Sequence, residues 1–212
     1  MGGLTPLTRN YVADFKFKRR QCVKLRAIRT PDMDQDTLRK ILRTVKDWPK
    51  AGINFYDICS IVERPDAFAW TVEQLIQLCV EHRIDALVSP DARGFLWGSA
   101  VAFALRLPLH LARKPGKLPG DVFTESYEYE YSSSSISMQA GCELKGKRVM
   151  LVDDVLATGG TALAILNLLR GRFGISSHQV FLSAVINLEF LGGRQRLQEK
   201  GVHVNALLNF NE

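Results

Sequence analysis

Residues 148–161 read RVMLVDDVLATGGT, and this run sets the architecture that we expect for the rest of the chain. It begins with four apolar residues, Val149 to Val152, which are typical of a parallel strand buried on both faces. It then passes through Asp153 and Asp154 into a loop of small residues, and from Thr161 onward the apolar residues recur at helical spacing. The run therefore predicts a strand, an acidic pair, a glycine-rich loop and a helix, in that order.

The glycine-rich loop has the chemistry of a phosphate site. Consecutive backbone N–H groups in a Thr-Gly-Gly-Thr turn converge on an anion, and the N-terminus of the following helix adds partial positive charge. The hydroxyls of Thr158 and Thr161 can donate hydrogen bonds to the same anion. Because carboxylates repel phosphate, Asp153 and Asp154 suit other work, such as accepting hydrogen bonds from ribose hydroxyls or standing near a divalent cation. The pattern indicates a sugar-phosphate site.

Length and composition fit one globular domain with an ordinary core. The chain has 212 residues, of which 46% are hydrophobic and 24% are charged. Its net charge of +6 suits an anionic ligand, although nucleic acid would satisfy it equally well. The four cysteines are scattered without metal-binding or redox spacing, which favours a reducing, cytoplasmic compartment. No apolar run reaches the length of a membrane span and no secretory signal is visible, so we expect no membrane partner.

The rest of the chain alternates between helix and strand patterns. Apolar residues at helical spacing predict a helix from Asp34 to Trp48, followed by a loop that leads into a strand near residue 58. Further helices are predicted at residues 65–82 and 94–105, strands at 84–89, 109–112, 178–186 and 202–208, and an irregular or helical passage at 190–200. This alternation predicts an α/β fold with a central, mostly parallel sheet flanked by helices. Ligands bind such sheets at the carboxyl ends of the strands.

Residues 113–139 differ in composition from the segments around them. They begin with the cationic turn RKPGKLPG and continue into an alternating aromatic and acidic run, ESYEYEY, which four serines follow at residues 132–135. Two prolines and two glycines exclude a helix or a central strand in the turn, and its three cations can hold a pyrophosphate. We expect a flexible flap, partly a hairpin, that closes over the ligand and excludes water.

Four blocks of sequence, in this order, resemble the adenine phosphoribosyltransferases of the type I phosphoribosyltransferase family. They are PKAGINF at residues 49–55, DARGF at 91–95, RKPGKLPG at 113–120 with SYEYEY at 126–131, and the acidic strand and loop at 148–161. The third block discriminates best, because other phosphoribosyltransferases carry different sequences there. The resemblance covers residues 47–209 and implies the type I phosphoribosyltransferase fold.

The resemblance implies transfer of a phosphoribosyl group from phosphoribosyl pyrophosphate (PRPP) to N9 of adenine, which yields AMP and pyrophosphate in purine salvage. It also implies Mg²⁺ as cofactor, held mainly through PRPP with no protein metal site, and a homodimer. By this likeness Glu130 on the flap is the catalytic acid or base, and Arg93 is a catalytic cation beside the pyrophosphate. The other implied contacts are the PRPP and AMP ligands Asp153, Asp154, Ala157, Thr158, Gly159, Gly160, Thr161, Arg113, Lys117 and Tyr131, and the base contacts Asn54, Phe55, Tyr56 and Val155.

Two positions depart from the family pattern. Family members usually have arginine where this chain has Tyr56 and an apolar residue where it has Asn54. If the backbone reads the edge of the base, the change is tolerated; if the arginine side chain matters, selectivity for adenine changes. One alternative is therefore a phosphoribosyltransferase for hypoxanthine, guanine or xanthine.

A second alternative is a non-catalytic regulator that binds PRPP through the same loop. Such proteins normally need a separate DNA-binding module, and the basic extension at residues 1–31 is too short for one. We therefore expect no nucleic-acid partner. Residues 32–212 are predicted to form a single phosphoribosyltransferase domain, with the flap at residues 113–139.

Overall fold

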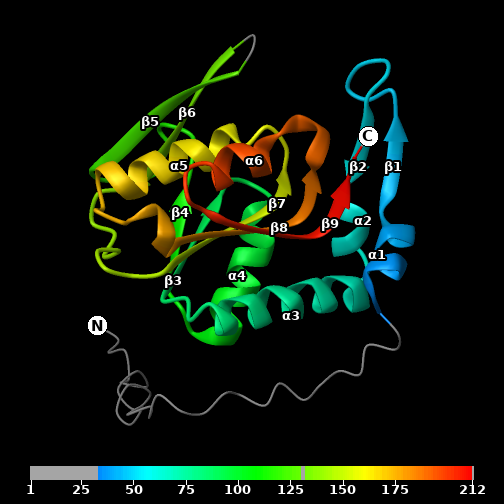
Figure 1. The fold of residues 1–212 in the computed structure, drawn as a ribbon, viewed down its shortest axis with the longest axis horizontal. Coiled ribbons are helices and arrows are strands. Elements are labelled where there is room, and N and C mark those ends of the chain that lie inside the picture. Colours follow the sequence, from blue (N-terminus) through cyan, green and yellow to red (C-terminus); the bar gives the residue numbers. More distant parts are fainter. Residues whose placement is uncertain (1–32, 130–131, 212) are drawn as a thin grey trace, which may run out of the picture.

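The structure, a computed structural model, describes residues 33–129 and 132–211. Within these ranges a central sheet of five parallel strands has the order β4-β3-β7-β8-β9 (Figure 1). These strands are β3 (Ala86–Pro90), β4 (Leu109–Ala112), β7 (Val149–Leu156), β8 (Val180–Leu188) and β9 (His203–Phe210). The parallel sheet confirms the predicted fold class. The basic extension at residues 1–31 lies outside the described residues.

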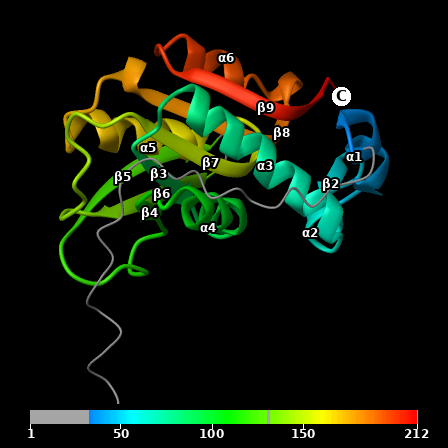
Figure 2. The ribbon, with the colours of Figure 1, turned by 90° about the horizontal axis from the view of Figure 1, so that it is seen from below.

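Helices cover both faces of the sheet (Figures 1 and 2). One face carries α5 (Gly160–Gly171) and α6 (Gly193–Gln198), and the other carries α3 (Pro65–Glu81) and α4 (Gly94–Leu105). Because successive side chains of a strand point to opposite faces, β7 feeds two cores. Val149 and Leu151 belong to the core that includes α5, whereas Met150 and Val152 belong to the core on the side of α3 and α4. This double burial is what the apolar run at the start of β7 predicted.

A small unit precedes α3, and we call it the cap segment (residues 35–62). It contains α1 (Gln35–Ile41), β1 (Arg43–Lys46), β2 (Asn54–Asp57) and α2 (Cys59–Val62). β1 and β2 pair with each other in a separate antiparallel sheet, in which Val45 lies opposite Phe55. Both ribbon views place this unit beside the end of β9 (Figures 1 and 2).

The predicted helix from Asp34 to Trp48 is wrong beyond Ile41. The helix begins as predicted, because the Asp34 side chain accepts a hydrogen bond of 2.8 Å from the backbone N–H of Thr37. The chain then turns extended, and residues 43–46 become β1. Val45 follows the preceding apolar residues at helical spacing, which favours a helix locally. Cross-strand pairing with β2 outweighs this local preference.

The segment predicted as a flap contains an antiparallel hairpin, β5 (Val122–Tyr129) with β6 (Ser132–Gln139). The hairpin extends away from the sheet in Figure 1. Its base is fixed, because Ile136 and Met138 are fully buried in the core beside α5 and Ser137 exchanges two backbone hydrogen bonds with Arg113. The serine run at residues 132–135 forms the first half of β6. The hairpin therefore grows out of the core and is not a free loop.

Two short 3-10 helices, Ser177–Gln179 and Glu189–Leu191, flank β8. The first one displaces the start of β8 to Val180, two residues later than the sequence predicted. The passage at residues 190–200 contains α6, as its helical alternative proposed. None of the helices in the described part of the chain is long and apolar enough to cross a membrane.

Candidate active site

The loop after β7 forms a small pocket at the N-terminus of α5. The pocket has a volume of about 60 Å³ and is lined by Asp153 and by every residue from Val155 to Ala162. Gly159, directly before the helix, has a φ of +80°, a conformation that favours glycine. The N–H of Leu163 makes the first hydrogen bond of the helix, 2.8 Å to the carbonyl oxygen of Gly159. The amides before Leu163 precede the helical hydrogen-bond ladder and can bind an anion.

Another glycine, Gly193, packs against this loop. A Cβ atom added to Gly193 would lie 2.2 Å from the carbonyl oxygen of Ala157 and 2.8 Å from the backbone nitrogen of Gly159. A Cβ atom on Gly159 would lie 3.1 Å from the Cα atom of Gly193. The two backbones can approach this closely only because neither residue has a side chain. This contact was not predicted from the sequence, because the partners lie far apart in the chain.

The acidic pair lies inside β7, whereas the sequence predicted it after the strand. β7 continues through both carboxylates to Leu156 and keeps its pairing with β8, in which Asp153 lies opposite Ala184. Asp154 is 5% exposed, and its carboxylate forms an ion pair with Arg93, in which Oδ2 lies 2.5 Å from Nε. The Oδ1 atom of Asp153 accepts a hydrogen bond of 2.9 Å from the backbone N–H of Asp154. The central strand thus holds both groups rigidly.

The two carboxylates differ in their surroundings. Burial, and then the negative charge of Asp154, raise the pKa of Asp153 well above its ordinary value. The guanidinium of Arg93 acts in the opposite direction on Asp153 but is the smaller influence. The charged form of Asp153 therefore costs the folded protein stability.

We expect Asp153→Asn to stabilise the free protein near neutral pH. Because the pKa of Asp153 is raised in the folded state, stability is fully present below the unfolded-state pKa of about 3.9 and is lost as the pH rises through the folded-state value. Asparagine keeps the acceptor oxygen and has no charge to bury. The Tm near pH 7.5 should rise by roughly 2–4 °C, the shift that about 1 kcal/mol causes in a chain of this size. Thermal unfolding near pH 7.5 and pH 4 measures this, and the gain should vanish at the lower pH. A lower Tm for the variant at neutral pH would contradict it.

A larger cleft, of about 520 Å³, opens at the carboxyl ends of the central strands. Its lining comes from four segments: Ile53, Asn54, Phe55 and Tyr56 of the cap segment; Pro90, Asp91, Ala92 and Arg93 at the end of β3 and just after it; Asp153, Asp154, Val155, Ala157 and Thr161 of β7 and its loop; and Leu188, Phe190 and Leu191 at the end of β8 and just after it. The cleft brings the predicted base contacts, Arg93, the acidic pair and part of the phosphate loop together. The contribution after β8 was missed. Its signal in the sequence was Phe190, a large apolar residue shortly after the predicted strand. In the structure Phe190 is 52% exposed.

The cationic turn lies beside this cleft and does not line it. The Nε atom of Arg113 is 3.5 Å from Oδ2 of Asp91, and its Nη1 donates a hydrogen bond of 3.1 Å to the carbonyl oxygen of Lys117. The backbone N–H of Lys114 also donates to Oδ2 of Asp91, at 3.3 Å. Asp91 itself lines the cleft, so this carboxylate connects the turn to it. The side chain of Lys117 is exposed.

The hairpin contacts the glycine-rich loop after β7 through a side chain that was not predicted from the sequence. The hydroxyl of Tyr127 on β5 lies 3.1 Å from Oγ1 of Thr161, at hydrogen-bond distance. This contact joins β5 to the first turn of α5. Glu130 and Tyr131, the other predicted contacts on the hairpin, lie outside the described residues.

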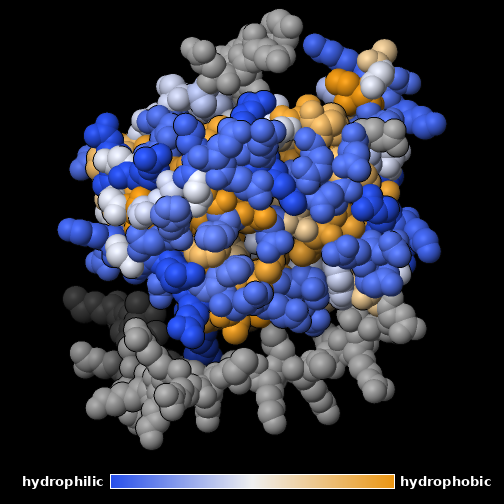
Figure 3. All heavy atoms as spheres, in the orientation of Figure 1, coloured by the Kyte–Doolittle hydropathy of each residue, from blue (hydrophilic) through white to orange (hydrophobic). Residues whose placement is uncertain are grey.

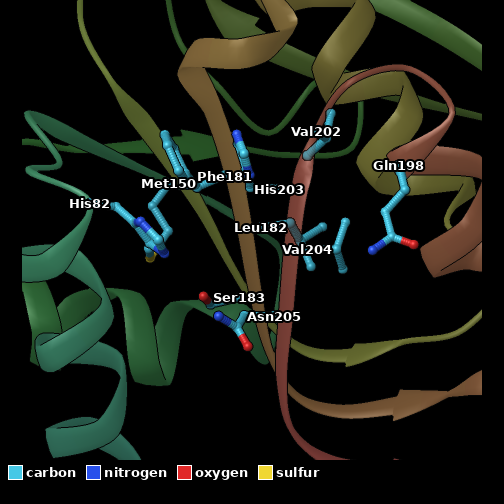
Figure 4. Close-up of a pocket in the computed structure, with 10 residues that line it drawn as sticks. All are labelled: His82, Met150, Phe181, Leu182, Ser183, Gln198, Val202, His203, Val204 and Asn205. Carbon is cyan, nitrogen blue, oxygen red and sulfur yellow. The ribbon is translucent and has the colours of Figure 1, made fainter.

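Another cavity, of about 240 Å³, lies away from the cleft, near the amino ends of β8 and β9 (Figure 4). The rings of His82 and His203 stack on Phe181, with centroid distances of 4.7 and 4.9 Å. Ser183 and Asn205 lie next to each other on its floor in Figure 4. None of the residues that line this cavity is a predicted site residue, and we do not assign it to the active site.

The chain is also similar to known proteins. The family described as "Phosphoribosyl transferase domain" matches residues 61–174. The adenine phosphoribosyltransferase of Marinobacter nauticus is 40% identical over 84% of this chain and 98% of its own, and that of Pseudomonas paraeruginosa is 42% identical over 84% and 96%.

Solved structures give the same result. The adenine phosphoribosyltransferase of Thermoanaerobacter pseudethanolicus has a TM-score of 0.75 and 33% identity, covering 83% of this chain and 99% of that one. The enzyme of Giardia lamblia complexed with 9-deazaadenine has a TM-score of 0.78 and 28% identity, covering 85% and 99%. The match to the domain family, the relatives at about 40% identity and the shared fold lead to one conclusion: the chain belongs to the adenine phosphoribosyltransferase family of phosphoribosyl transferase domains.

Proposed function

We propose that this chain transfers the phosphoribosyl group of PRPP to N9 of adenine and releases AMP and pyrophosphate, a reaction of purine salvage. The observation that carries the proposal is the 520 Å³ cleft, which unites the base contacts of the cap segment, the Arg93–Asp154 pair and the start of the phosphate loop. A nucleotide needs these three kinds of contact, for its base, its sugar and its phosphate.

The pocket at the N-terminus of α5 is assigned to the 5′-phosphate. The backbone from Ala157 to Thr161 curves around this pocket, and the helix N-terminus supplies partial positive charge. Asp153 and Asp154 lie at the junction of this pocket and the larger cleft, where they can accept hydrogen bonds from the ribose hydroxyls. When a ribose displaces Arg93 from Asp154, the guanidinium becomes available to the pyrophosphate.

The base is assigned to the part of the cleft beneath the cap segment. Phe55 lines it, and its ring is braced by Trp48 at a centroid distance of 4.3 Å in an edge-to-face arrangement. A braced ring is a ready surface for stacking with a purine. Asn54, Tyr56 and Val155 line the same part and can present backbone groups to the edge of the base.

Charge development explains the placement of the cations. Breaking the anomeric bond builds positive charge on the sugar and negative charge on the departing pyrophosphate, so fixed cations are most useful at the pyrophosphate end. Arg93 lines the cleft and Arg113 stands beside it, 3.5 Å from Asp91, while Lys117 continues the same turn. We assign the purine proton to Glu130 by family likeness, and a closed hairpin would limit attack by water.

We propose that Mg²⁺ is bound mainly through PRPP. Among the described residues no group of three or more His, Cys, Asp or Glu side chains could hold a metal ion. Mg²⁺ keeps several waters and is commonly held by one or two carboxylates together with substrate phosphates. Asp153 and Asp154 could contribute to such a site from the sugar side. The ion would neutralise charge on the pyrophosphate.

We further propose that the protein is a cytoplasmic homodimer. On the outer face of α4, Phe103 is 88% exposed and Leu96 is 43% exposed, and exposed apolar side chains gathered on one face are typical of an interface.

We expect Phe103→Glu to weaken association by at least about 10-fold, because a buried carboxylate without a partner is costly at an interface. Sedimentation velocity over a dilution series measures this. Val80→Glu, at a 60% exposed position on α3, is the matched control and should leave the dimer intact.

The test of the function is formation of AMP from adenine, PRPP and Mg²⁺, with hypoxanthine, guanine and xanthine in parallel reactions. The proposal expects turnover with adenine and a kcat/KM at least about 100-fold lower for the other bases. A higher kcat/KM with hypoxanthine, guanine or xanthine would identify that base, and not adenine, as the substrate. Binding of PRPP without turnover of any base would favour the non-catalytic regulator.

A further inference from the structure

The last residues of β9 contact both walls of the cleft without lining it. The cap segment forms one wall, and the residues after β8 form the other. Phe210, the last residue of β9, contacts the cap segment. Asn209 before it accepts hydrogen bonds from the cap segment and from the side of β8 and α6. Both ribbon views show the end of β9 beside α1 and β2 (Figures 1 and 2). The end of β9 therefore connects the two walls through its contacts.

An aromatic stack connects the cap segment to this strand end. The ring of Tyr56 on β2 lies on the ring of Phe210, with centroids 4.0 Å apart and an interplanar angle of 31°. The guanidinium of Arg39 on α1 lies 4.5 Å from the centroid of the Phe210 ring, a cation–π distance. The Nη2 atom of Arg39 also donates a hydrogen bond of 3.1 Å to the carbonyl oxygen of Asn209. Two elements of the cap segment therefore meet at one phenyl ring.

Side-chain contacts of this kind matter because β2 does not join the central sheet. Among the described residues β2 pairs only with β1, so no ladder of backbone hydrogen bonds fixes it to β8 or β9. The ion pair between Arg43 and Asp57 lies within the cap segment and cannot orient it against the sheet. The position of β2 over the cleft therefore rests on side-chain contacts, among them the stacking on Phe210 of Tyr56, which lines the cleft.

The other wall is tied to the neighbouring residue. The Oδ1 atom of Asn209 accepts hydrogen bonds from Nη2 of Arg194, at 2.6 Å, and from Nδ2 of Asn187, at 3.3 Å. Arg194 in turn forms an ion pair with Glu189, with 3.3 Å between Nε and Oε1, at the start of the segment that contributes Phe190 to the cleft. A displacement of either wall relative to the other would have to break contacts at the end of β9.

We propose that Phe210 is a positioning residue that sets the affinity for the purine base by holding Tyr56, and with it β2, over the cleft. This inference rests on the proposed function and deepens it. It assigns the side chain of Tyr56, which replaces the usual arginine of the family, to packing on β9. Recognition of the base is left to the backbone of β2 and to Phe55. The replacement therefore does not change which base is selected.

Steady-state kinetics of Phe210→Ala separate this role from a general loss of structure. The KM for adenine should rise about 2- to 10-fold, the range for loss of one aromatic pair, while kcat and the KM for PRPP stay within about twofold of the original protein. Phe210→Tyr keeps the ring and should restore the KM for adenine. Asn211→Ala changes the exposed residue that follows and is the matched control. An unchanged KM for adenine, or an equal rise in both KM values, would overturn the proposal.

Two further measurements test the contact itself. Tyr56→Ala combined with Phe210→Ala should raise the KM for adenine by less than the product of the two single effects, because both remove the same contact. Hydrogen exchange of the free protein should be faster in Phe210→Ala at residues 43–57 and unchanged in α5. Unchanged exchange at residues 43–57 would overturn the positioning role. If the original protein makes no AMP from adenine, the proposed function fails, whereas faster exchange would still establish the contact.

Discussion

Gly193→Ala should lower kcat/KM for PRPP by at least about 100-fold, because a displacement of about 1 Å at a binding loop can cost that much. The added Cβ atom would lie 2.2 Å from the carbonyl oxygen of Ala157 and 2.8 Å from the backbone nitrogen of Gly159. Both atoms belong to the backbone of the phosphate loop, so neither can move aside as a flexible side chain would. The loop must shift, and the amides around the 5′-phosphate site shift with it. Initial rates at varied PRPP concentrations measure the effect.

Gly171→Ala is the matched control for this variant. Gly171 ends α5, and a Cβ atom added there would meet no atom within 4 Å. Alanine is also the better helix former, so activity should be unchanged and the Tm should not fall. Circular dichroism of Gly193→Ala should show that the domain remains folded, because α6 tolerates alanine at its first position. If Gly193→Ala were as active as the control, the close contact between Gly193 and the loop would not be needed for binding of the 5′-phosphate.

Asp154→Asn is the second change with a large expected effect, a loss of about 10²- to 10³-fold in kcat, the range for removal of one hydrogen-bonding group that stabilises a transition state. The carboxylate is held in the central strand, is 5% exposed and pairs with Arg93 at 2.5 Å. Asparagine has nearly the same volume but neither the charge that orients the guanidinium nor the full acceptor capacity for ribose hydroxyls. The variant should therefore fold and bind adenine while turnover fails.

The measurement is single-turnover formation of AMP, accompanied by thermal unfolding. Glu143→Gln removes one negative charge at an exposed position and should retain activity, which separates the local effect from a change in net charge. Turnover of Asp154→Asn within about tenfold of the original protein would exclude a role for this carboxylate in the chemical step. A collapse of the Tm would instead assign it a structural role.

The central domain was accessible from sequence because its signals are local. The apolar run from Val149 to Val152 is fully buried, and the Thr-Gly-Gly-Thr turn forms a pocket at a helix N-terminus. The helices at residues 65–81 and 94–105 were also found, the first from apolar residues at helical spacing and the second as a run rich in small residues. Burial on both faces leaves a strand little freedom in composition, so its pattern is easy to recognise.

The errors occurred where a distant partner decides the outcome. Residues 43–46 have apolar spacing that suits a helix, yet they form a strand because β2 lies opposite them. The acidic pair was expected after its strand, but pairing with β8 extends β7 as far as Leu156. In both cases the missing information was a hydrogen-bonding partner elsewhere in the chain.

What the sequence by itself determined was the α/β order of elements, the family and the glycine-rich loop that we propose for the 5′-phosphate, because each of these depends on residues that are neighbours in the chain. Only the tertiary structure decided which distant groups meet there: Gly193 behind the loop, Asp154 against Arg93, Tyr127 at Thr161, and Phe210 beneath Tyr56. Contacts of this kind depend on how whole elements pack, and packing at interior density is set by all of the side chains together.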